Sequence, residues 1–486
     1  MKQVRLSMDF ITEPERKVPL RDAGDVLVLG GGPAGMIAAM AAASRGASTT
    51  LVERYGFLGG MATAALVGPF AGTRHRYGGG RIIGGIPWEL ILRLVRHGGA
   101  TLDTFCYPSD GGSSSDPDDS SPPGLPAGLP AGSSAGSRGT GRGDIPFDPE
   151  VLKWVSEQMA LEAGVRLQYH SAATGVVKTE KQISAVLVES KSGRQALCAR
   201  VIVDATGDAD IAAFAGVPFE TGRPGDGALQ PMTLMFRLGG VDTDGLGDIS
   251  RPFVPPFIRR KAEEAVAREK LPVFGGPWTF WGSTFRPGEV MVNMVRLWGD
   301  ATDVEVLTRN EITGRAHMQQ FVAFLKENFT EFKNSFLIDS GPQIGIRETR
   351  RIRGAYVLTG EDIRGERKFS DAVALGGHVI DIHSPDGTSQ QVRKKVSPYQ
   401  IPYRCLLPQG IGNLLVAGRP ISASHEAHAS LRVMGTCMAT GQAAGVAAAM
   451  AARKNGDPAG VDIADLQGAL LETGALIHGG VSDPHE

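Results

Sequence analysis

Three glycines near the N-terminus have a spacing that suits a phosphate-bearing ligand. Gly30, Gly32 and Gly35 form a Gly-x-Gly-x-x-Gly pattern. In this pattern the first glycine permits a tight turn, the second lets the backbone approach a pyrophosphate, and the third lets a helix pack closely on a strand. The backbone N–H groups that begin such a helix attract negative charge. The pattern therefore predicts a binding site for a dinucleotide.

The residues around these glycines predict the elements that the site requires. Residues 25–30 (DVLVLG) form an apolar run of buried-strand length, residues 36–46 (MIAAMAAASRG) suit a helix, and residues 48–53 (STTLVE) suit a second strand. A strand, a turn, a helix and a strand in this order form a βαβ unit of a parallel sheet. Glu53 ends the second strand, where a carboxylate can accept hydrogen bonds from ribose hydroxyls. These residues alone leave FAD and NAD as alternatives.

A second pattern of chemically active residues lies near the C-terminus. His425-Glu426-Ala427-His428 resembles the start of the zinc motif H-E-x-x-H, but that motif needs a histidine at position 429, which is alanine here. The four cysteines are scattered, without the spacing of a zinc site, an iron–sulfur cluster or a redox-active pair. We therefore expect no metal site.

Length, composition and charge limit the number of domains and the kinds of partner that the protein can have. The chain has 486 residues, of which 42% are hydrophobic and 21% charged, so it is long enough for two or three domains. A net charge of −2 argues against nucleic acid and anionic membranes as required partners, because both need a concentrated basic surface. No signal-peptide core and no strongly apolar run of about 20 residues is evident. We expect a cytoplasmic protein without membrane insertion.

Three segments resemble a known group of flavoproteins. Residues 25–54, followed by GFLGGMAT at 56–63, resemble the opening of the two-dinucleotide-fold flavoproteins, which include glutathione reductase and the fumarate reductase flavoproteins. VIVDATGDADIAAFAG (201–216) resembles their second FAD motif, and residues 413–449 resemble their C-terminal flavin motif. The chain is most similar to the bacterial FAD-dependent oxidoreductase family, which also has counterparts of residues 345–354 and 401–408. This resemblance implies that FAD is the cofactor.

The resemblance also implies which residues bind FAD. The first motif would hold the ADP half, the segment after Gly59 would line the pyrophosphate and the ribityl chain, Val177 would approach the adenine through its backbone, and the last helix would point its N-terminus at the flavin. The complete set of implied cofactor residues is Gly30, Gly32, Pro33, Ala34, Gly35, Glu53, Arg54, Gly59, Gly60, Met61, Ala62, Thr63, Val177, Ala205, Thr206, Gly207, Gly418, Arg419, Val433 and Met434.

The motifs divide the chain into segments. We expect an α/β fold, in which a Rossmann-like FAD-binding domain with a parallel sheet is interrupted by a mixed α/β substrate domain. The expected segments are a first part of the FAD-binding domain (22–106), a flexible low-complexity insertion (107–144), a second part (145–222), the inserted substrate domain (223–395), the C-terminal flavin motif (396–455) and a tail (456–486). The insertion is mostly Gly, Ser and Pro, which cannot bury enough surface to offset the entropy of ordering.

Departures from the flavoprotein motifs limit the types of reaction that the chain can catalyse. Disulfide reductases carry a cysteine pair after the Gly-Gly turn, where this chain has Met61-Ala62-Thr63, so that class is excluded. Flavin hydroxylases carry a Gly-Asp motif before the final helix, where this chain has Ala417-Gly418-Arg419, so hydroxylation is less favoured.

Candidate catalytic residues follow from the C-terminal motif. His425 and Arg432 resemble, by position, the histidine and arginine that hold a substrate carboxylate in fumarate reductase flavoproteins. We expect a loop over residues 424–435 that projects both side chains toward the flavin, with His425 as a general base and Arg432 as a clamp for an anionic or carbonyl group.

Two other clusters carry charge near this motif. His378, Asp381 and His383 form a second set of catalytic candidates, since they end the inserted segment just before the chain returns to the FAD-binding domain. A further group (Arg347, Glu348, Arg350 and Arg351) predicts an ion-pair network between domains.

Together these observations predict an FAD-dependent oxidoreductase of the dehydrogenase or oxidase type. The expected reaction is a two-electron dehydrogenation in which hydride passes from an unidentified small organic substrate to flavin N5. Only one Gly-x-Gly-x-x-Gly unit is present, so oxygen, a quinone or a protein carrier is the expected electron acceptor. The alternatives are a flavin monooxygenase, an ene-reductase, or an electron-transfer subunit that holds FAD within a complex. The oligomeric state stays open.

Overall fold

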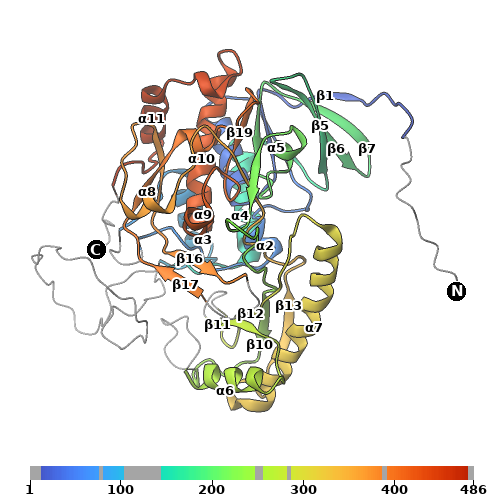
Figure 1. Cartoon of the computed structure of the whole chain (residues 1–486), viewed down its shortest axis with the longest axis vertical. Coiled ribbons are helices and arrows are strands. Elements are labelled where there is room, and N and C mark those ends of the chain that lie inside the picture. The colour runs from blue at the N-terminus through green and yellow to red at the C-terminus, as the bar shows by residue number, and fades with distance from the viewer. Residues whose placement is uncertain are drawn as a thin grey trace, which may run out of the picture.

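The computed structural model describes residues 13–75, 80–102, 144–246, 256–281, 286–385 and 391–479. These residues form a mixed α/β molecule, with a parallel sheet in the upper part of Figure 1 and an antiparallel sheet in the lower part. Nearly all of the predicted low-complexity insertion, residues 107–143, lies outside the described residues, as do residues 480–486 of the predicted tail.

The predicted βαβ unit lies within a five-stranded parallel sheet. The strand order is β19 (Leu414–Val416), β8 (Val201–Asp204), β2 (Val26–Leu29), β3 (Thr49–Val52) and β4 (Arg166–Gln168). Helix α1 (Pro33–Ser44) connects β2 to β3. Because the carboxyl ends of parallel strands meet at one edge, the residues after β2, β3 and β8 lie together. Gly30, Glu53 and Ala205 therefore reach the same cavity.

Helices α1 and α10 (Met434–Ala452) pack backbone against backbone. A Cβ atom on Gly441 would lie 2.1 Å from the carbonyl oxygen of Ala34, and one on Gly445 would lie 2.1 Å from that of Ala38. Only glycine allows so close an approach. The contact holds the N-terminus of α10 at the edge of the parallel sheet, beside the start of α1.

We expect the Gly445→Ala variant to have a free energy of unfolding lower by about 1–3 kcal/mol, because the added methyl group overpacks this contact. Denaturant titration measures the difference. The matched control is Gly468→Ala in α11 (Ile463–Glu472), where a Cβ atom meets nothing within 4 Å. That change should be neutral or slightly stabilising, since alanine favours a helix more than glycine does. Equal stability of the two variants would contradict the proposed role of Gly445.

A second sheet and several helices surround the parallel sheet. The four-stranded sheet has the order β1 (Leu20–Asp22), β7 (Gly193–Cys198), β6 (Ile183–Ser190) and β5 (Ala172–Lys178). Other helices of this part include α2 (Met61–Ala64), α3 (Ile86–Arg96), α4 (Pro149–Glu162), α5 (Asp210–Phe214) and α8 (Gly360–Arg364).

The antiparallel sheet has a hydrophobic cluster of its own. Its order is β11 (Phe274–Trp281), β12 (Val290–Val295), β10 (Phe236–Gly239) and β13 (Phe336–Ser340), with helices α6 (Pro256–Ala267) and α7 (Val304–Asn328) beside it (Figure 1). We call this cluster, which runs from Met232 to Ile346, the lower core. The larger cluster around α1 and α10 is the upper core, and it includes Leu358 and Ile380.

Residues after 346 form short ladders and contribute to the hydrophobic clusters around the parallel sheet. These are β14 (Arg350–Ile352) with β9 (Phe219–Thr221), β15 (Ala372–Gly376) with β18 (Tyr399–Pro402), and β16 (Ile380–His383) with β17 (Gln391–Lys394). The inserted segment 223–395 therefore contributes its first two thirds to the lower core and its last third to the upper core.

The expectation of a loop over residues 424–435 is wrong, because a helix occupies most of it. Helix α9 (His425–Leu431) begins where the Ser424 hydroxyl accepts a hydrogen bond from the N–H of Ala427. Ser424 is a favourable N-cap residue, and this cap starts the helix at once. Arg432 is the C-cap of α9, and Val433 is the N-cap of α10.

Within the described ranges, no helix is both long enough and apolar enough to cross a membrane.

Candidate active site

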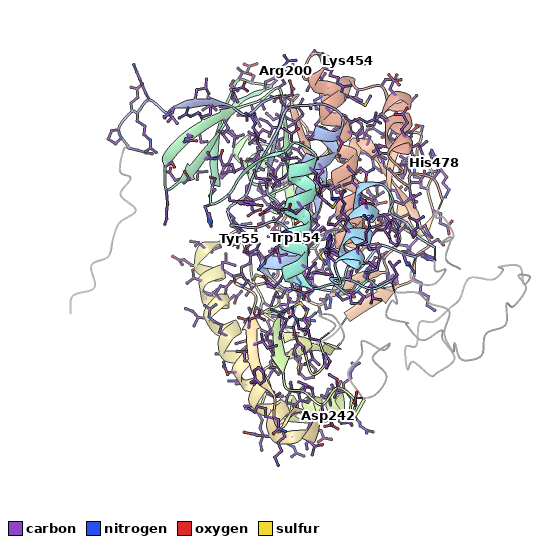
Figure 2. The ribbon with its side chains drawn as sticks, turned by 180° about the vertical axis from the view of Figure 1, so that it is seen from behind. Tyr55, Trp154, Arg200, Asp242, Lys454 and His478 are labelled. Atoms are coloured by element: carbon purple, nitrogen blue, oxygen red, sulfur yellow. The ribbon has the colours of Figure 1, made fainter. Side chains whose placement is uncertain are left out.

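A cavity of about 360 Å³ lies where the carboxyl edge of the parallel sheet faces the antiparallel sheet. Gly30 and Glu53 line it from the parallel sheet, and Thr233 and Asn293 line it from the other side. Tyr55 also lines it, and Figure 2 shows this residue at middle height, between the two parts of the molecule. The Tyr55 hydroxyl donates a hydrogen bond to Gln343, which joins the two parts. The cavity is therefore walled by both cores.

The glycine turn opens the start of α1 to this cavity. Gly30 has a φ of +93°, in the region that favours glycine. A Cβ atom on Gly35 would lie 1.8 Å from the carbonyl oxygen of Gly30, so the turn requires glycine at position 35. Gly32 is the N-cap of α1, and a Cβ atom there would meet only Gly60 Cα, at 3.8 Å. The first backbone N–H groups of α1 therefore face the cavity without a covering side chain.

Glu53 shapes the same turn. Its Oε2 atom accepts a hydrogen bond from the N–H of Gly31 at 2.6 Å, and its Oε1 atom accepts one from the N–H of Tyr55 at 2.9 Å. The residue is buried and lines the cavity. Each carboxylate oxygen retains a second lone pair, which can accept a hydrogen bond from a bound hydroxyl group.

The strands β8 and β19 bring a charged pair to the cavity. The Arg419 guanidinium donates a hydrogen bond to the Asp208 carboxylate at 2.6 Å and one to the Thr349 hydroxyl at 3.3 Å. Asp208 follows the Ala-Thr-Gly turn after β8, and Arg419 follows Gly418 after β19. Both side chains line the cavity beside the glycine turn.

Most residues predicted to bind the cofactor line this cavity. They are Gly30, Gly32, Pro33, Ala34, Glu53, Arg54, Gly60, Met61, Ala205, Thr206, Gly207, Gly418, Arg419, Val433 and Met434. The structure does not bring Gly35, Gly59, Ala62, Thr63 or Val177 to the cavity wall. Gly35 and Gly59 support the turns behind the wall, whereas Val177 is exposed on β5, and Ala172 and Ala173 at the start of that strand line the cavity instead.

Charged side chains gather at another part of the cavity wall. Arg347, His378, Asp381, His383 and Arg432 all line it. Asp381 and His383 lie on β16, Arg432 ends α9, and Arg347 follows the last residue of the lower core. The second set of sequence candidates is thus in the cavity together with Arg432.

Asp381 connects two of these side chains. His383 Nε2 lies 3.2 Å from Asp381 Oδ2, and the Arg432 guanidinium lies 3.6 Å from the same oxygen and donates a hydrogen bond to the Asp381 carbonyl at 3.1 Å. Burial lowers the pKa of His383 to about 3, helped by the positive charges of Arg347 and Arg296 and opposed by Asp381. The imidazole is therefore neutral at ordinary pH, and Asp381 fixes its orientation.

His425 does not line the cavity. Its Nδ1 atom lies 2.8 Å from Glu348 Oε1, and both side chains are buried. Glu348 also forms a buried ion pair with Arg351 and accepts a hydrogen bond from the N–H of Gln230. Burial raises the pKa of Glu348, but these partners outweigh it and lower the pKa overall. The helical conformation of α9 thus turns His425 toward the interior, contrary to the expected projection toward the flavin.

The predicted ion-pair network contains three of its four expected residues. Glu348 pairs with Arg351, and Arg350 pairs with Asp210 at 2.9 Å. Arg347 is the exception: it lines the cavity, and its guanidinium donates a hydrogen bond to the carbonyl oxygen of Pro231 at 2.6 Å.

Several residues that line the cavity could not be identified from a sequence motif. Thr233 and Asn293 lie on different segments of the lower core, outside any recognisable motif. Arg296 lies behind them and donates hydrogen bonds to both side chains. Strand β12 reads Val-Met-Val-Asn-Met-Val, so Asn293 interrupts an otherwise apolar buried strand, and this is the one sequence feature that could have marked it.

The cavity wall has the features that FAD requires. The exposed N-terminus of α1 can bind a pyrophosphate, Glu53 can bind a ribose, and the N-terminus of α10 offers N–H groups to an electron-rich ring. A Cβ atom on Gly32 would meet only Gly60, so the space beside the start of α1 is open. Among the described residues, no group of three His, Cys, Asp or Glu side chains could hold a metal ion.

Comparison with solved structures gives matches over most of the chain at low similarity. A geranylgeranyl bacteriochlorophyll reductase-like protein from Thermoplasma acidophilum is 14% identical, with a TM-score of 0.39 over 93% of this chain and 84% of that chain. The p-nitrophenol 4-monooxygenase from Pseudomonas putida is 11% identical, with a TM-score of 0.45 and the same coverage of 93% and 84%. An anhydrotetracycline hydroxylase from Streptomyces rimosus is 12% identical, with a TM-score of 0.40 over 93% and 66%. Comparison with curated proteins gives no match.

A family model identifies the chain more directly. The model described as FAD dependent oxidoreductase matches residues 25–470. That range spans the glycine turn, both cores and helix α10. The match agrees with the FAD-binding features of the cavity, and FAD is the cofactor. The chain belongs to the family of FAD-dependent oxidoreductases.

Proposed function

We propose that this FAD-dependent oxidoreductase dehydrogenates a small organic substrate in the part of the cavity lined by Arg347, Asp381, His383 and Arg432. FAD, when bound, supplies the acceptor for two electrons and a hydrogen as hydride. The protein must then position the substrate and take up the proton that leaves with the hydride. The observation that carries the proposal is the buried Asp381–His383 pair on the cavity wall.

The Asp381–His383 pair places an unprotonated imidazole beside a carboxylate on the cavity wall. The neutral imidazole of His383, whose Nε2 atom lies 3.2 Å from Asp381, can accept the proton of a substrate hydroxyl group or acidic C–H. Asp381 then balances the positive charge that forms on the ring. Arg432 bridges Asp381 and the start of α10, so it orients this pair relative to the cofactor.

The cofactor site that we propose is Rossmann-like. The N-terminus of α1 holds the pyrophosphate, Glu53 holds the adenosine ribose, and the N-terminus of α10 stabilises negative charge on the flavin ring. The lower core then supplies the opposite wall and contacts the substrate through Thr233 and Asn293. Oxygen, a quinone or a protein carrier would be the final electron acceptor.

Anaerobic stopped-flow spectroscopy tests the proposal. The purified FAD-loaded protein is mixed without oxygen, and without NADH or NADPH, with a panel of small hydroxy and amino compounds. At least one compound should bleach the flavin absorbance and yield the dehydrogenated product in a 1:1 ratio with FAD. Flavin reduction by a nicotinamide alone, with substrate conversion only after oxygen is added, would overturn dehydrogenation and assign a monooxygenase.

A further inference from the structure

One polar side chain interrupts the face of the antiparallel sheet that borders the cavity. Asn293 lies on β12 between Val292 and Met294, which are both buried in the lower core. Successive side chains of a strand point to opposite faces, so Asn293 is directed away from that core. It lines the cavity and is partly exposed, whereas its neighbours in the strand are buried. A molecule in the cavity can therefore reach the amide group of Asn293.

Two buried side chains hold one end of this amide. The Oδ1 atom of Asn293 accepts a hydrogen bond from the Thr233 hydroxyl at 2.8 Å and another from Nη1 of Arg296 at 2.9 Å. Burial lowers the pKa of Arg296 to about 10, so the guanidinium group is still protonated at neutral pH. A guanidinium group only donates, so the amide atom that faces it must be the oxygen. Arg296 thus determines which way the amide of Asn293 lies.

The guanidinium group of Arg296 is itself held in place. Its Nη1 atom also donates to the Thr233 hydroxyl at 3.2 Å and to the carbonyl oxygen of Val295 at 3.1 Å. Strand β11 leaves room for the group, because a Cβ atom on Gly275 would lie 2.0 Å from Nε of Arg296. A side chain at that position would displace the guanidinium. Arg296 therefore supports the cavity wall from behind.

The amide nitrogen of Asn293 points away from these two partners. Oxygen and nitrogen lie on different sides of one planar carbon, so Nδ2 is turned from Arg296 and Thr233 when Oδ1 faces them. Among the residues that the structure describes, Nδ2 donates no hydrogen bond. Its two N–H groups are thus available to an acceptor in the cavity. The two donors to Oδ1 occupy both of its lone pairs, so Asn293 offers no acceptor of its own.

We propose that Asn293 determines substrate specificity by donating a hydrogen bond to a carbonyl oxygen of the substrate, and that Arg296 positions the amide for this contact. The inference rests on the proposed function, because it names the substrate class for the same cavity. A carbonyl oxygen suits the site better than a hydroxyl group, whose proton would need an acceptor that Asn293 cannot offer. The substrate therefore carries a carbonyl group apart from the carbon that loses the hydride.

Two probes of nearly the same shape test the direction of this hydrogen bond. Acetophenone offers a carbonyl oxygen and no N–H or O–H group, whereas benzamidinium offers only N–H donors. Each probe is titrated into the oxidised FAD-loaded protein, and the change in the flavin absorbance spectrum gives its dissociation constant. Acetophenone should bind, and the ratio of the two dissociation constants is then compared between variants. Charges elsewhere in the cavity act on this ratio equally in every variant.

Asn293→Asp keeps the shape of the side chain but replaces the donor with an acceptor. One carboxylate oxygen can still accept from Arg296 and Thr233, and the other then faces the cavity. The variant should bind acetophenone about 10-fold more weakly, the effect of losing one hydrogen bond, and should bind benzamidinium more tightly. Asn293→Leu should lose affinity for acetophenone without gaining any for benzamidinium. The matched control, Asn334→Asp, adds the same charge at an exposed residue and should keep the original ratio.

Substitution of Arg296 tests the positioning role. Lysine at this position still only donates, so the Asn293 oxygen should continue to face it. Glutamine can accept as well as donate, so the amide of Asn293 can turn over. Arg296→Gln should therefore lose more of the preference for acetophenone than Arg296→Lys does. A merely structural role would lower the melting temperature of both variants and leave their ratios equal.

Several results would overturn the inference. An unchanged ratio in Asn293→Asp, or no binding of acetophenone to the unmodified protein, would exclude the hydrogen bond, and equal ratios in the two Arg296 variants would exclude the positioning role. An unchanged ratio together with a shifted flavin midpoint potential in Asn293→Asp would assign Asn293 to the flavin. Acetophenone binding that depends on Asn293, with no flavin reduction by any carbonyl compound, would support the hydrogen bond and contradict the proposed dehydrogenation.

Discussion

The His383→Asn variant is expected to retain FAD but to undergo flavin reduction by substrate about 10²- to 10⁴-fold more slowly, the usual effect of removing a general base. Asparagine keeps a polar side chain in the cavity but cannot accept a proton at neutral pH. Anaerobic stopped-flow spectroscopy with the substrate found for the unmodified protein measures the rate, and release of FAD on denaturation measures the cofactor content.

His425→Asn is the matched control, because His425 is also buried but contacts Glu348 rather than the cavity. We expect it to lower the free energy of unfolding by about 1–3 kcal/mol, the cost of a buried acceptor left with fewer partners, and to change the reduction rate much less. Normal reduction in His383→Asn together with slow reduction in His425→Asn would place the base at His425 after all.

The pH dependence of the reaction provides an independent test of the electrostatic coupling between His383 and Arg347. Because the pKa of His383 is lowered to about 3, its imidazole is neutral throughout the range from about pH 5 to 8 in the free protein. Removal of the positive charge in Arg347→Gln should raise that pKa, since protonation of His383 is then less opposed. The acidic limb of the kcat/KM profile should therefore move to higher pH in Arg347→Gln. A shift to lower pH would contradict the coupling between the two residues.

Glu53→Lys is expected to lose FAD, with a dissociation constant raised by about 10²-fold or more, because two hydrogen bonds to a buried carboxylate are removed. The carboxylate accepts from Gly31 and Tyr55, so it shapes the glycine turn as well as offering acceptors to the ribose. An ammonium group there would face the backbone N–H groups of the turn. The ratio of FAD to protein after gel filtration measures the loss.

Glu53→Gln is the conservative control. It retains one carbonyl oxygen that can accept from the turn, so its loss of FAD should be smaller than that of Glu53→Lys. Stoichiometric FAD in the Glu53→Lys protein, or FMN in place of FAD in the unmodified protein, would contradict the assignment of the ADP half to this turn.

The sequence predicts the cofactor side of the cavity much better than the substrate side. The glycine spacing and the apolar runs on either side are local signals, and the structure places α1 and both flanking strands where they indicate. The start of α10 after Val433 was predictable for the same reason, because a run of small residues begins there. Local patterns determine these elements, and a parallel sheet brings its strand ends together.

The direction of His425 could not be predicted in this way. The position of His425 in the motif suggests a side chain that faces the flavin. Ser424 is the N-cap of α9, however, so His425 is the first residue of a helix, and the geometry of that helix sets the direction of its side chain. The opposite wall presents a harder problem, since Thr233 and Asn293 meet only through tertiary packing of the lower core. Which charged side chains meet on the cavity wall is also a property of the folded chain, so no spacing rule reveals that Arg432 lies 3.6 Å from Asp381.

The two cores have a consequence for how specificity can change during evolution. Asp381, His383 and Arg432 lie on segments of the upper core, beside Ile380 and Leu431, whereas Asn293 and Arg296 lie among residues of the lower core. Mutations that remodel the lower core can thus alter which substrate is accepted while the Asp381–His383 pair keeps its place on the cavity wall. Proteins that descend from one ancestor can therefore diverge in substrate specificity through changes in residues 232–346 and still catalyse the same reaction.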